Sequence, residues 1–153
     1  MSVTGIVYLV NKATRHISFA GEVPETYGQI TGLKGVDYSV LRDLGSHFPD
    51  EQGSYANLGF LTENDARDVG VPLEDLVRMK QAAWELKWES LEVEREALIQ
   101  AQRWRIDRYR DETDLGVPHT EDIMPVLQYC QDIRNLPIKY PDPYNIVWPT
   151  VPA

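Results

Sequence analysis

The clearest pattern of apolar and polar positions lies between residues 72 and 111, where strong helix formers follow Pro72 without a glycine or a further proline. Proline suits the first turn of a helix, where its missing N–H is not needed. The pattern therefore predicts one long helix over residues 72–111. Its apolar residues form two rows that each step by seven positions: Val77, Trp84, Leu91 and Leu98, extended by Trp88, and Met79, Leu86 and Val93.

The two rows lie on nearly opposite faces of the predicted helix, because Trp84 and Leu86 are separated by about 200° of helical rotation. A surface helix normally carries one apolar stripe, and a second exposed row would leave a large apolar patch. We therefore expect the helix to contact protein on both faces, with one face meeting a second copy of the chain or a partner protein. Lys80, Lys87 and Glu94 between the rows argue against a plain coiled-coil seam.

Residues 1–70 have a different pattern, with β-branched and aromatic residues at 5–10 and 16–20 flanking the polar segment 11–14. Two such runs around a short turn predict a β-hairpin. Capping signals predict further short elements in this module: a helix at 36–41 with Asp37 as its N-cap, a strand at about 54–60, and a helix that starts at Thr62 and ends at Gly70.

The C-terminal part combines a predicted helix with a proline-rich segment. Asp122 is a candidate N-cap and Pro125 suits the first turn, so a helix is expected to run to about Asn135. After Pro137 the prolines disfavour a helix and favour an extended path. We expect residues 141–152 to lie extended and ordered against the two C-terminal helices, with Trp148 as the anchor.

These elements predict an α+β fold with two parts. Residues 1–70 form a small β-rich module. Residues 72–153 form the long helix, a turn at 113–121, a second helix antiparallel to the first, and the extended proline-rich tail.

Composition changes this picture mainly through charge. The chain has 153 residues and a formal net charge of -9. Such a charge argues against nucleic acid and against an anionic membrane surface as partners. The N-terminus lacks the features of a signal peptide, no run reaches a membrane span, and the single cysteine, Cys130, rules out an internal disulfide. We therefore expect a soluble protein made in the cytosol.

The sequence contains no spacing typical of catalysis or metal binding. His16, His47 and His119 are scattered, and the glycines match no phosphate-binding loop. One cysteine cannot complete a structural zinc site, and Cys130 on a predicted helix is typical of a small buried residue. We predict no catalytic residue, no cofactor and no metal. Trp84 and Trp88, one helical turn apart, are more typical of core or interface anchors than of a ligand site.

The last fifty residues contain three motifs in order: an arginine-rich run that ends in Thr113-Asp114, the segment 129–137, and a tail that ends in Val147-Trp148-Pro149-Thr150-Val151-Pro152. Together they resemble the phage tail assembly chaperone family, which is often encoded beside tail-fibre genes. That family has an arginine-rich helix ending in Thr-Asp, a following helix with a Tyr-Arg-Gln…Leu-Arg-Asp-Ile motif, and a tail ending in Val-x-Trp-Pro-Thr-x-Pro. Here Cys130 replaces the usual arginine and Asn135 the usual aspartate, and Leu115 and Gly116 follow the Thr-Asp pair in place of tryptophan. The similar segments are residues 103–114, 129–137 and 141–152.

The motif also has a physical interpretation. Arginines of the first helix can hydrogen-bond carbonyls or carboxylates of the following helix and tail, and Arg134 is a candidate for a forked clamp on the returning chain. Two roles stay open for the tail: a structural strap or a partner-facing segment. The candidate partner-binding residues are Trp84, Trp88, Leu91, Met79, Leu86, Val93, Arg134 and Trp148.

The resemblance implies a non-enzymatic protein that binds a tail-fibre or tail structural protein during assembly in the host cytoplasm and then leaves. The alternative is a structural subunit that stays in the virion tail, as a fibre component or an adaptor at the baseplate. An enzyme acting on surface polymers has no residue support.

Overall fold

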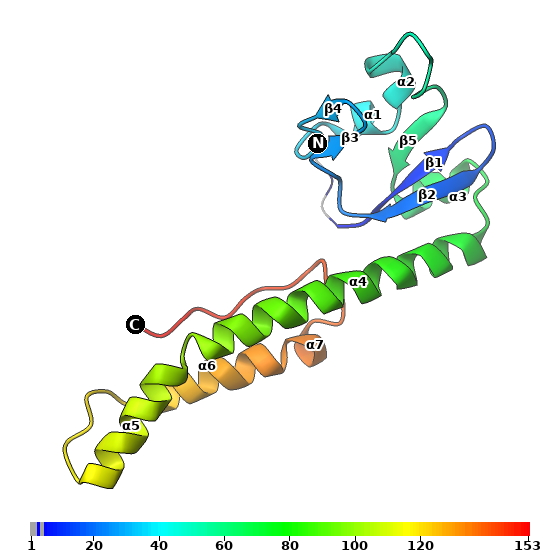
Figure 1. Ribbon diagram of the computed structural model, residues 1–153. Helices are drawn as coiled ribbons and strands as arrows, with labels where there is room; N and C mark the ends of the chain where they lie inside the picture. The colour runs from blue at the N-terminus through cyan, green and yellow to red at the C-terminus, as the bar shows by residue number, and fades with distance from the viewer. Residues whose placement is uncertain (1–2, 4) are drawn as a thin grey trace. The chain divides into compact units, whose positions relative to one another are not determined.

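The computed structural model describes residue 3 and residues 5–153, and its fold is α+β, as predicted (Figure 1). The chain forms two compact units, Met1–Glu85 and Leu86–Ala153. None of the helices in the described residues is long and apolar enough to cross a membrane. The elements are β1 Val7–Asn11, β2 His16–Gly21, β3 Thr26–Tyr27, β4 Ile30–Thr31, α1 Tyr38–Leu41, α2 Leu44–His47, β5 Leu58–Leu61, α3 Glu63–Asp68, α4 Leu73–Gln100, α5 Arg103–Leu115, α6 Met124–Arg134 and α7 Leu136–Lys139.

The predicted β-hairpin is present, and it forms part of an antiparallel sheet of order β2-β1-β5. Its register shifts between Leu9 and Val10, where Leu9 pairs with Phe19 but Val10 pairs with Ile17. This bulge reverses the alternation of side chains along β2. As a result, Phe19 packs on one face of the sheet and Ile17 on the other.

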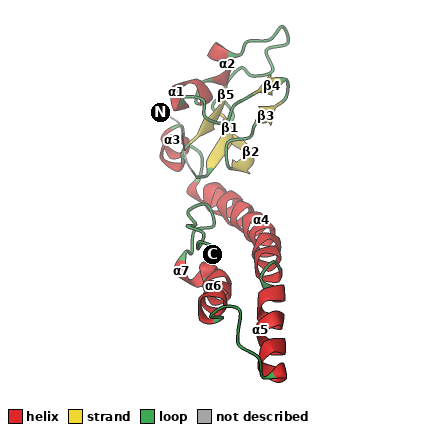
Figure 2. Cartoon of the chain, turned by 90° about the vertical axis from the view of Figure 1, so that its left-hand side faces the viewer, coloured by secondary structure: helices red, strands yellow, loops and turns green. Residues whose placement is uncertain are grey.

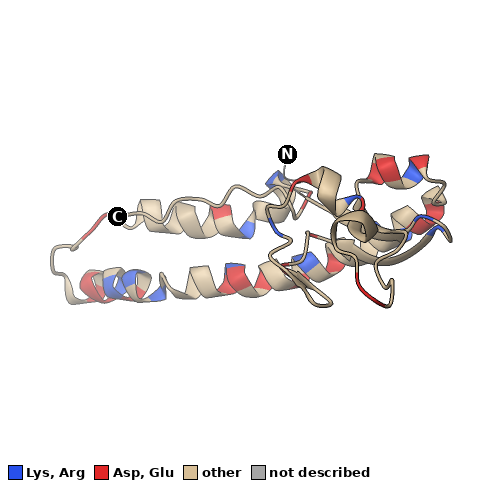
Figure 3. Ribbon diagram, turned by 90° about the horizontal axis from the view of Figure 1, so that it is seen from above, with Lys and Arg blue, Asp and Glu red and all other residues tan. Residues whose placement is uncertain are grey.

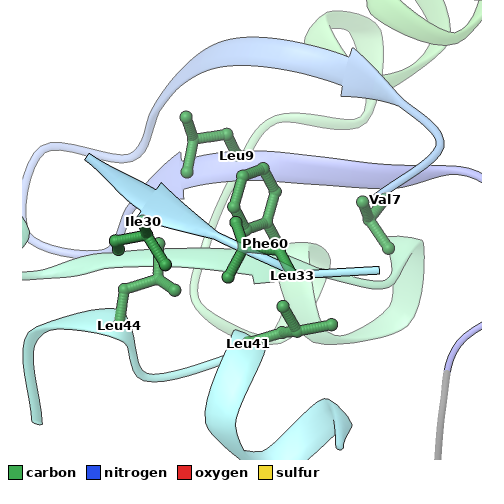
Figure 4. Packing of buried hydrophobic residues seen from close by; sticks show 7 residues of the cluster. All are labelled: Val7, Leu9, Ile30, Leu33, Leu41, Leu44 and Phe60. Carbon is green, nitrogen blue, oxygen red and sulfur yellow. The ribbon is translucent and has the colours of Figure 1, made fainter. Parts of the chain in front are cut away.

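The central strand β1 is buried on both faces, because neighbouring side chains of a strand point to opposite sides. Val7 and Leu9 enter the cluster shown in Figure 4, where Phe60 lies beside residues from the loops and short helices. The Phe60 ring meets Phe19 and Tyr27 edge-on, at centroid distances of 6.3 and 5.6 Å. The other members of this cluster are Ile30, Leu33, Leu41 and Leu44.

The opposite face of the sheet is covered by α3 and the first turns of α4. Tyr8 and Val10 of β1 pack there with Ala66 of α3 and Leu76 of α4, and Met79 lies against the same cluster. The first turns of α4 thus belong to the core of the N-terminal unit. For this reason the contacts divide the two units inside α4, after Glu85, whereas the composition changes at residues 70–72.

Two of the three predicted N-caps, Asp37 and Thr62, are confirmed, and a tyrosine links them. The third is a correction: the N-cap of α6 is Ile123, and Asp122 one position earlier accepts the Met124 N–H at 3.0 Å. Asp37 accepts the Ser39 N–H at 3.0 Å, and Thr62 accepts the Asp65 N–H at 3.4 Å. The Tyr38 hydroxyl accepts the Thr62 N–H at 2.9 Å and donates to the Asp65 carboxylate. Burial raises the pKa of Tyr38, and the hydrogen bond to Asp65 raises it further, so the hydroxyl stays protonated and tethers α1 to α3.

The predicted helix over 72–111 is divided into α4 and α5, which is a correction to the single long helix. At the junction the Gln102 N–H bonds the Ile99 carbonyl at 3.0 Å, three residues back, in place of the helical four. Such a tight turn bends a helix. The bend precedes Arg105, whose side chain has the central role described below.

The proline-rich segment is less extended than predicted. Residues 136–139 form α7, in which Pro137 occupies the first turn, where a missing N–H costs nothing. Residues 142–145 form a turn, in which the Tyr144 N–H bonds the Asp142 carboxylate at 2.9 Å and the Asn145 N–H bonds the Asp142 carbonyl at 3.1 Å. The extended path begins only at Ile146. The small hairpin β3–β4 and the helix α2 also had no sequence prediction.

Replacing Tyr38 by Phe should lower the free energy of unfolding by about 1–2 kcal/mol, because the Thr62 N–H and the Asp65 carboxylate lose their partner. The raised pKa means that this contribution is fully present below the ordinary tyrosine value of 10.0 and is lost as pH rises through the raised value. The difference between variant and parent in urea unfolding should therefore shrink in alkaline solution. Tyr27→Phe is the control, and an equal loss there would contradict the tether.

Candidate functional site

The second unit is a hairpin in which the later part of α4 and α5 lie against α6 (Figure 2), and the C-terminal tail returns along it (Figure 1). Its core contains Ile99 of α4 and Tyr129, Cys130, Ile133 and Leu136 of the following helices. Cys130 is a free thiol and buried, in agreement with the sequence interpretation. The helices therefore share one apolar core, and the polar contacts around it determine how the tail is held.

Arg95 of α4 fastens the C-terminal end of α6. Its Nε donates to the Ile133 carbonyl at 3.1 Å, and its Nη2 donates to the Arg134 carbonyl at 3.0 Å. The last carbonyls of a helix lack partners within the helix and carry partial negative charge. The Arg95 guanidinium bonds two of these carbonyls at once, so it holds the end of α6 against α4.

Arg105 of α5 uses all five of its N–H donors. Nε and Nη2 bond the two carboxylate oxygens of Glu121 at 2.8 and 3.3 Å, and Nη1 bonds Gln102 Oε1 at 3.1 Å. The remaining donors of Nη1 and Nη2 bond the main-chain oxygens of Pro152 and Ala153, both at 2.9 Å. Guanidinium has five donors in a rigid plane, and a buried one needs all of them satisfied. The side chain is only 10% exposed.

The Glu121 carboxylate accepts hydrogen bonds from two arginines, Arg105 and Arg108. Besides the Arg105 pair, its Oε2 accepts from Nη2 of Arg108 at 2.9 Å. The Arg108 guanidinium also lies 5.0 Å from the centroid of the Trp104 ring. The predicted pairing of arginines with the following helix region and tail is thus present, and Arg105 and Arg95 provide the forks.

The extended part of the tail alternates between core and solvent. Ile146 and Trp148 pack against the apolar core, whereas Val147 between them is 68% exposed. Alternate side chains of an extended chain point to opposite sides, which the sequence predicted for these residues. The half-buried Trp148 and the Arg105 fork therefore hold the tail at two points.

Between α6, α7 and the tail lies a groove of about 860 Å³. Its walls are rich in aromatic rings and prolines, and Ile138 and Val147 are 81% and 68% exposed at its edge. Few ionisable groups face it. The lining residues are Pro125, Gln128, Tyr129, Asp132, Asn135, Leu136, Ile138, Lys139, Tyr140, Val147, Trp148, Pro149, Thr150 and Pro152.

The two predicted rows of α4 have different surroundings. In the first row, Leu91 is buried, Leu98 packs against the core of the second unit, and Trp84 and Trp88 are half-buried. Val77, from the same row, is exposed.

In the second row, Met79 packs in the N-terminal unit. Leu86 and Val93 are 68% and 73% exposed. The described residues thus leave an apolar pair on α4 uncovered.

Arg134 does not form the fork that the sequence suggested for it. It is exposed at the end of α6, and only its main-chain carbonyl takes part, as an acceptor for Arg95. Sequence reasoning also missed Glu121 as the shared carboxylate and did not single out Arg105. The alternation of arginines and acids over 103–112 was the available signal.

No group of three or more potential metal ligands occurs among the described residues. No protein-family model, curated protein or solved structure matches the chain. The resemblance of the C-terminal segments to a phage family therefore stays a prediction from the motifs.

Replacing Arg105 by Lys should lower the free energy of unfolding by about 2–3 kcal/mol, because a lysine keeps the charge but cannot reach five acceptors in one plane. Residues 146–153 should also become accessible to protease. Urea unfolding and limited proteolysis measure the two effects. Arg103→Lys, at an exposed position of the same helix, is the control; a tail equally protected in both variants would contradict the clamp.

Trp148→Ala should lower the free energy of unfolding by about 1–3 kcal/mol, less than for a fully buried tryptophan, because the ring is half-buried. Val147→Ala, at the neighbouring exposed position, should change it by less than about 0.5 kcal/mol. Thermal unfolding of both variants tests the anchor. Unchanged stability in Trp148→Ala would show that the tail is not a strap.

Proposed function

We propose that this chain is a non-enzymatic assembly protein of the tail or tail fibre of a tailed bacteriophage, and that its second unit binds a fibre or tail protein. The observation that carries the proposal is the convergence of the three family-like segments. Arg105 from the first segment, Tyr129 from the second and Trp148 from the third all belong to one arrangement of core, clamp and tail.

The convergence supports the resemblance because it joins residues far apart in sequence. Arg105 and Pro152 are separated by 47 positions, yet they share a direct hydrogen bond. Segments whose order and spacing match a family, and whose side chains also contact one another, fit a common architecture better than a chance similarity.

The groove and the exposed pair on α4 support the partner-binding part of the proposal. Contiguous exposed apolar residues on a soluble protein commonly mark protein-binding surfaces. Ile138 and Val147 at the groove, and Leu86 and Val93 on α4, are all more than two-thirds exposed. The aromatic and proline lining suits an extended apolar segment of a partner, because grooves lined by aromatic rings are known to dock extended peptides.

The test is capture of the tail and fibre proteins encoded beside the gene. The tagged chain is expressed together with them, and bound proteins are identified by mass spectrometry. The parent should capture a tail or fibre protein. The double variant Ile138→Asn/Val147→Asn should bind that protein about tenfold more weakly, which corresponds to about 1.4 kcal/mol of binding free energy. Leu115→Asn, an equally exposed apolar residue on α5, is the control.

Capture of no tail or fibre protein by the parent chain would refute the proposal. Mass spectrometry of purified virions then separates the two forms of the function. Abundant peptides from this chain would identify a structural subunit of the tail or baseplate, and their absence from virions that need the chain for assembly would identify a chaperone that leaves.

A further inference from the structure

The outward face of α4 in the second unit carries a narrow strip of apolar and small side chains. At 100° per residue, Leu86, Ser90, Val93 and Ala97 fall within about 60° of one another, and they extend over about 16 Å of helix. All four are exposed. Leu91, on the opposite face, is buried in the same segment. The strip has the width and spacing of one side of a two-helix contact.

Glutamates border this strip on both sides. By the same helical geometry Glu89, Glu92 and Glu96 lie along one edge, and Glu94 lies along the other. All four are exposed, and Glu96 accepts a hydrogen bond from Gln100 at 2.9 Å. Figure 3 shows acidic positions along this helix. The apolar strip is therefore flanked by concentrated negative charge.

The basic residues of the same segment are turned toward the C-terminal elements. The Lys87 ammonium lies 5.6 Å from the centroid of the Tyr144 ring. Arg95 donates to the carbonyls of Ile133 and Arg134. The Arg95 guanidinium is therefore directed at α6, and four of the charged side chains that border the strip are acidic.

We propose that the strip Leu86–Ala97 is the docking surface for a partner helix whose apolar seam is flanked by lysines or arginines. This inference rests on the proposed function, because it takes the chain to bind a partner protein. The apolar residues supply the contact area of a helix-on-helix interface. The glutamates supply the orientation and the selection of partner, because flanking charges in paired helices act mainly through complementarity.

A second copy of this chain does not fit the strip. In an antiparallel pair, the edge with Glu89, Glu92 and Glu96 would face the same edge of the other copy. In a parallel pair, that edge would face the edge with Glu94, whose neighbour Lys87 is held over the Tyr144 ring. Both arrangements bring like charges together, which destabilises a helix pair.

The probe is a synthetic helix of about three heptads with leucines at the seam and lysines at the flanking positions. A peptide of the same composition in scrambled order is the control for non-specific attraction to an acidic protein. The full chain should bind the ordered peptide at least tenfold more tightly than the scrambled one, as measured by fluorescence anisotropy. Binding should weaken at about 0.5 M NaCl, where charges are strongly screened.

Two variants separate the apolar and the charged contributions. Leu86→Asn/Val93→Asn should weaken binding of the ordered peptide at least tenfold without loss of stability, because both residues are exposed. Glu89→Gln/Glu92→Gln/Glu96→Gln should remove most of the salt dependence. Leu115→Asn, which is 75% exposed on α5, should leave binding unchanged.

Equal binding of the two peptides, or binding unaffected by the Leu86/Val93 variant, would overturn the inference. So would light scattering that showed a dimer of the parent chain and a monomer of that variant. The capture experiment with the groove variant is independent of this titration. If the titration fails while a tail or fibre protein is still captured, the strip is refuted and the proposed function stands.

Discussion

The guanidinium of Arg105 joins α5, the loop before α6 and the end of the tail in the second unit. Arg105 is 10% exposed, and each of its five donors has an acceptor: a carboxylate, a side-chain amide and two main-chain oxygens. Burying a cation is costly, and each of its donors that lacks a partner adds a further cost. The arrangement is therefore favourable only when Glu121 and the end of the tail are both in place. Its main effect is to fix the end of the tail, through the main-chain oxygens of Pro152 and Ala153.

The groove depends on that selection. One of its walls is the tail itself, and the other walls are α6 and α7, whose position Arg95 fixes through two carbonyls of α6. Apolar packing of Ile146 and Trp148 brings the tail to the core, but packing alone is tolerant of small shifts. The two forked arginines add direction, because their donors have fixed geometry. The shape of the groove therefore depends on the hydrogen bonds of Arg95 and Arg105.

The sequence predicted the elements whose signals are local. The hairpin, the caps at Asp37 and Thr62, and the alternation of Ile146 and Trp148 all follow from patterns within a few residues. It did not predict the bend before Arg105 or identify which arginine forms the clamp, since several arginines share the same helix and the acceptors lie far along the chain. The turn at 142–145 and α7 were missed because prolines fit the first turn of a helix as well as an extended path.

The helix α4 belongs to both units, with its first turns in the core beside the sheet and its last turns in the core beside α6. Starting a helix is unfavourable, whereas extending one that exists costs little. Whichever unit folds first therefore provides a nucleus from which the shared helix can grow into the other. The two cores are joined thermodynamically through this backbone, so local unfolding of one should fray the helix that the other needs. Because α4 is common to both cores, we expect the unfolding of the two units to be coupled.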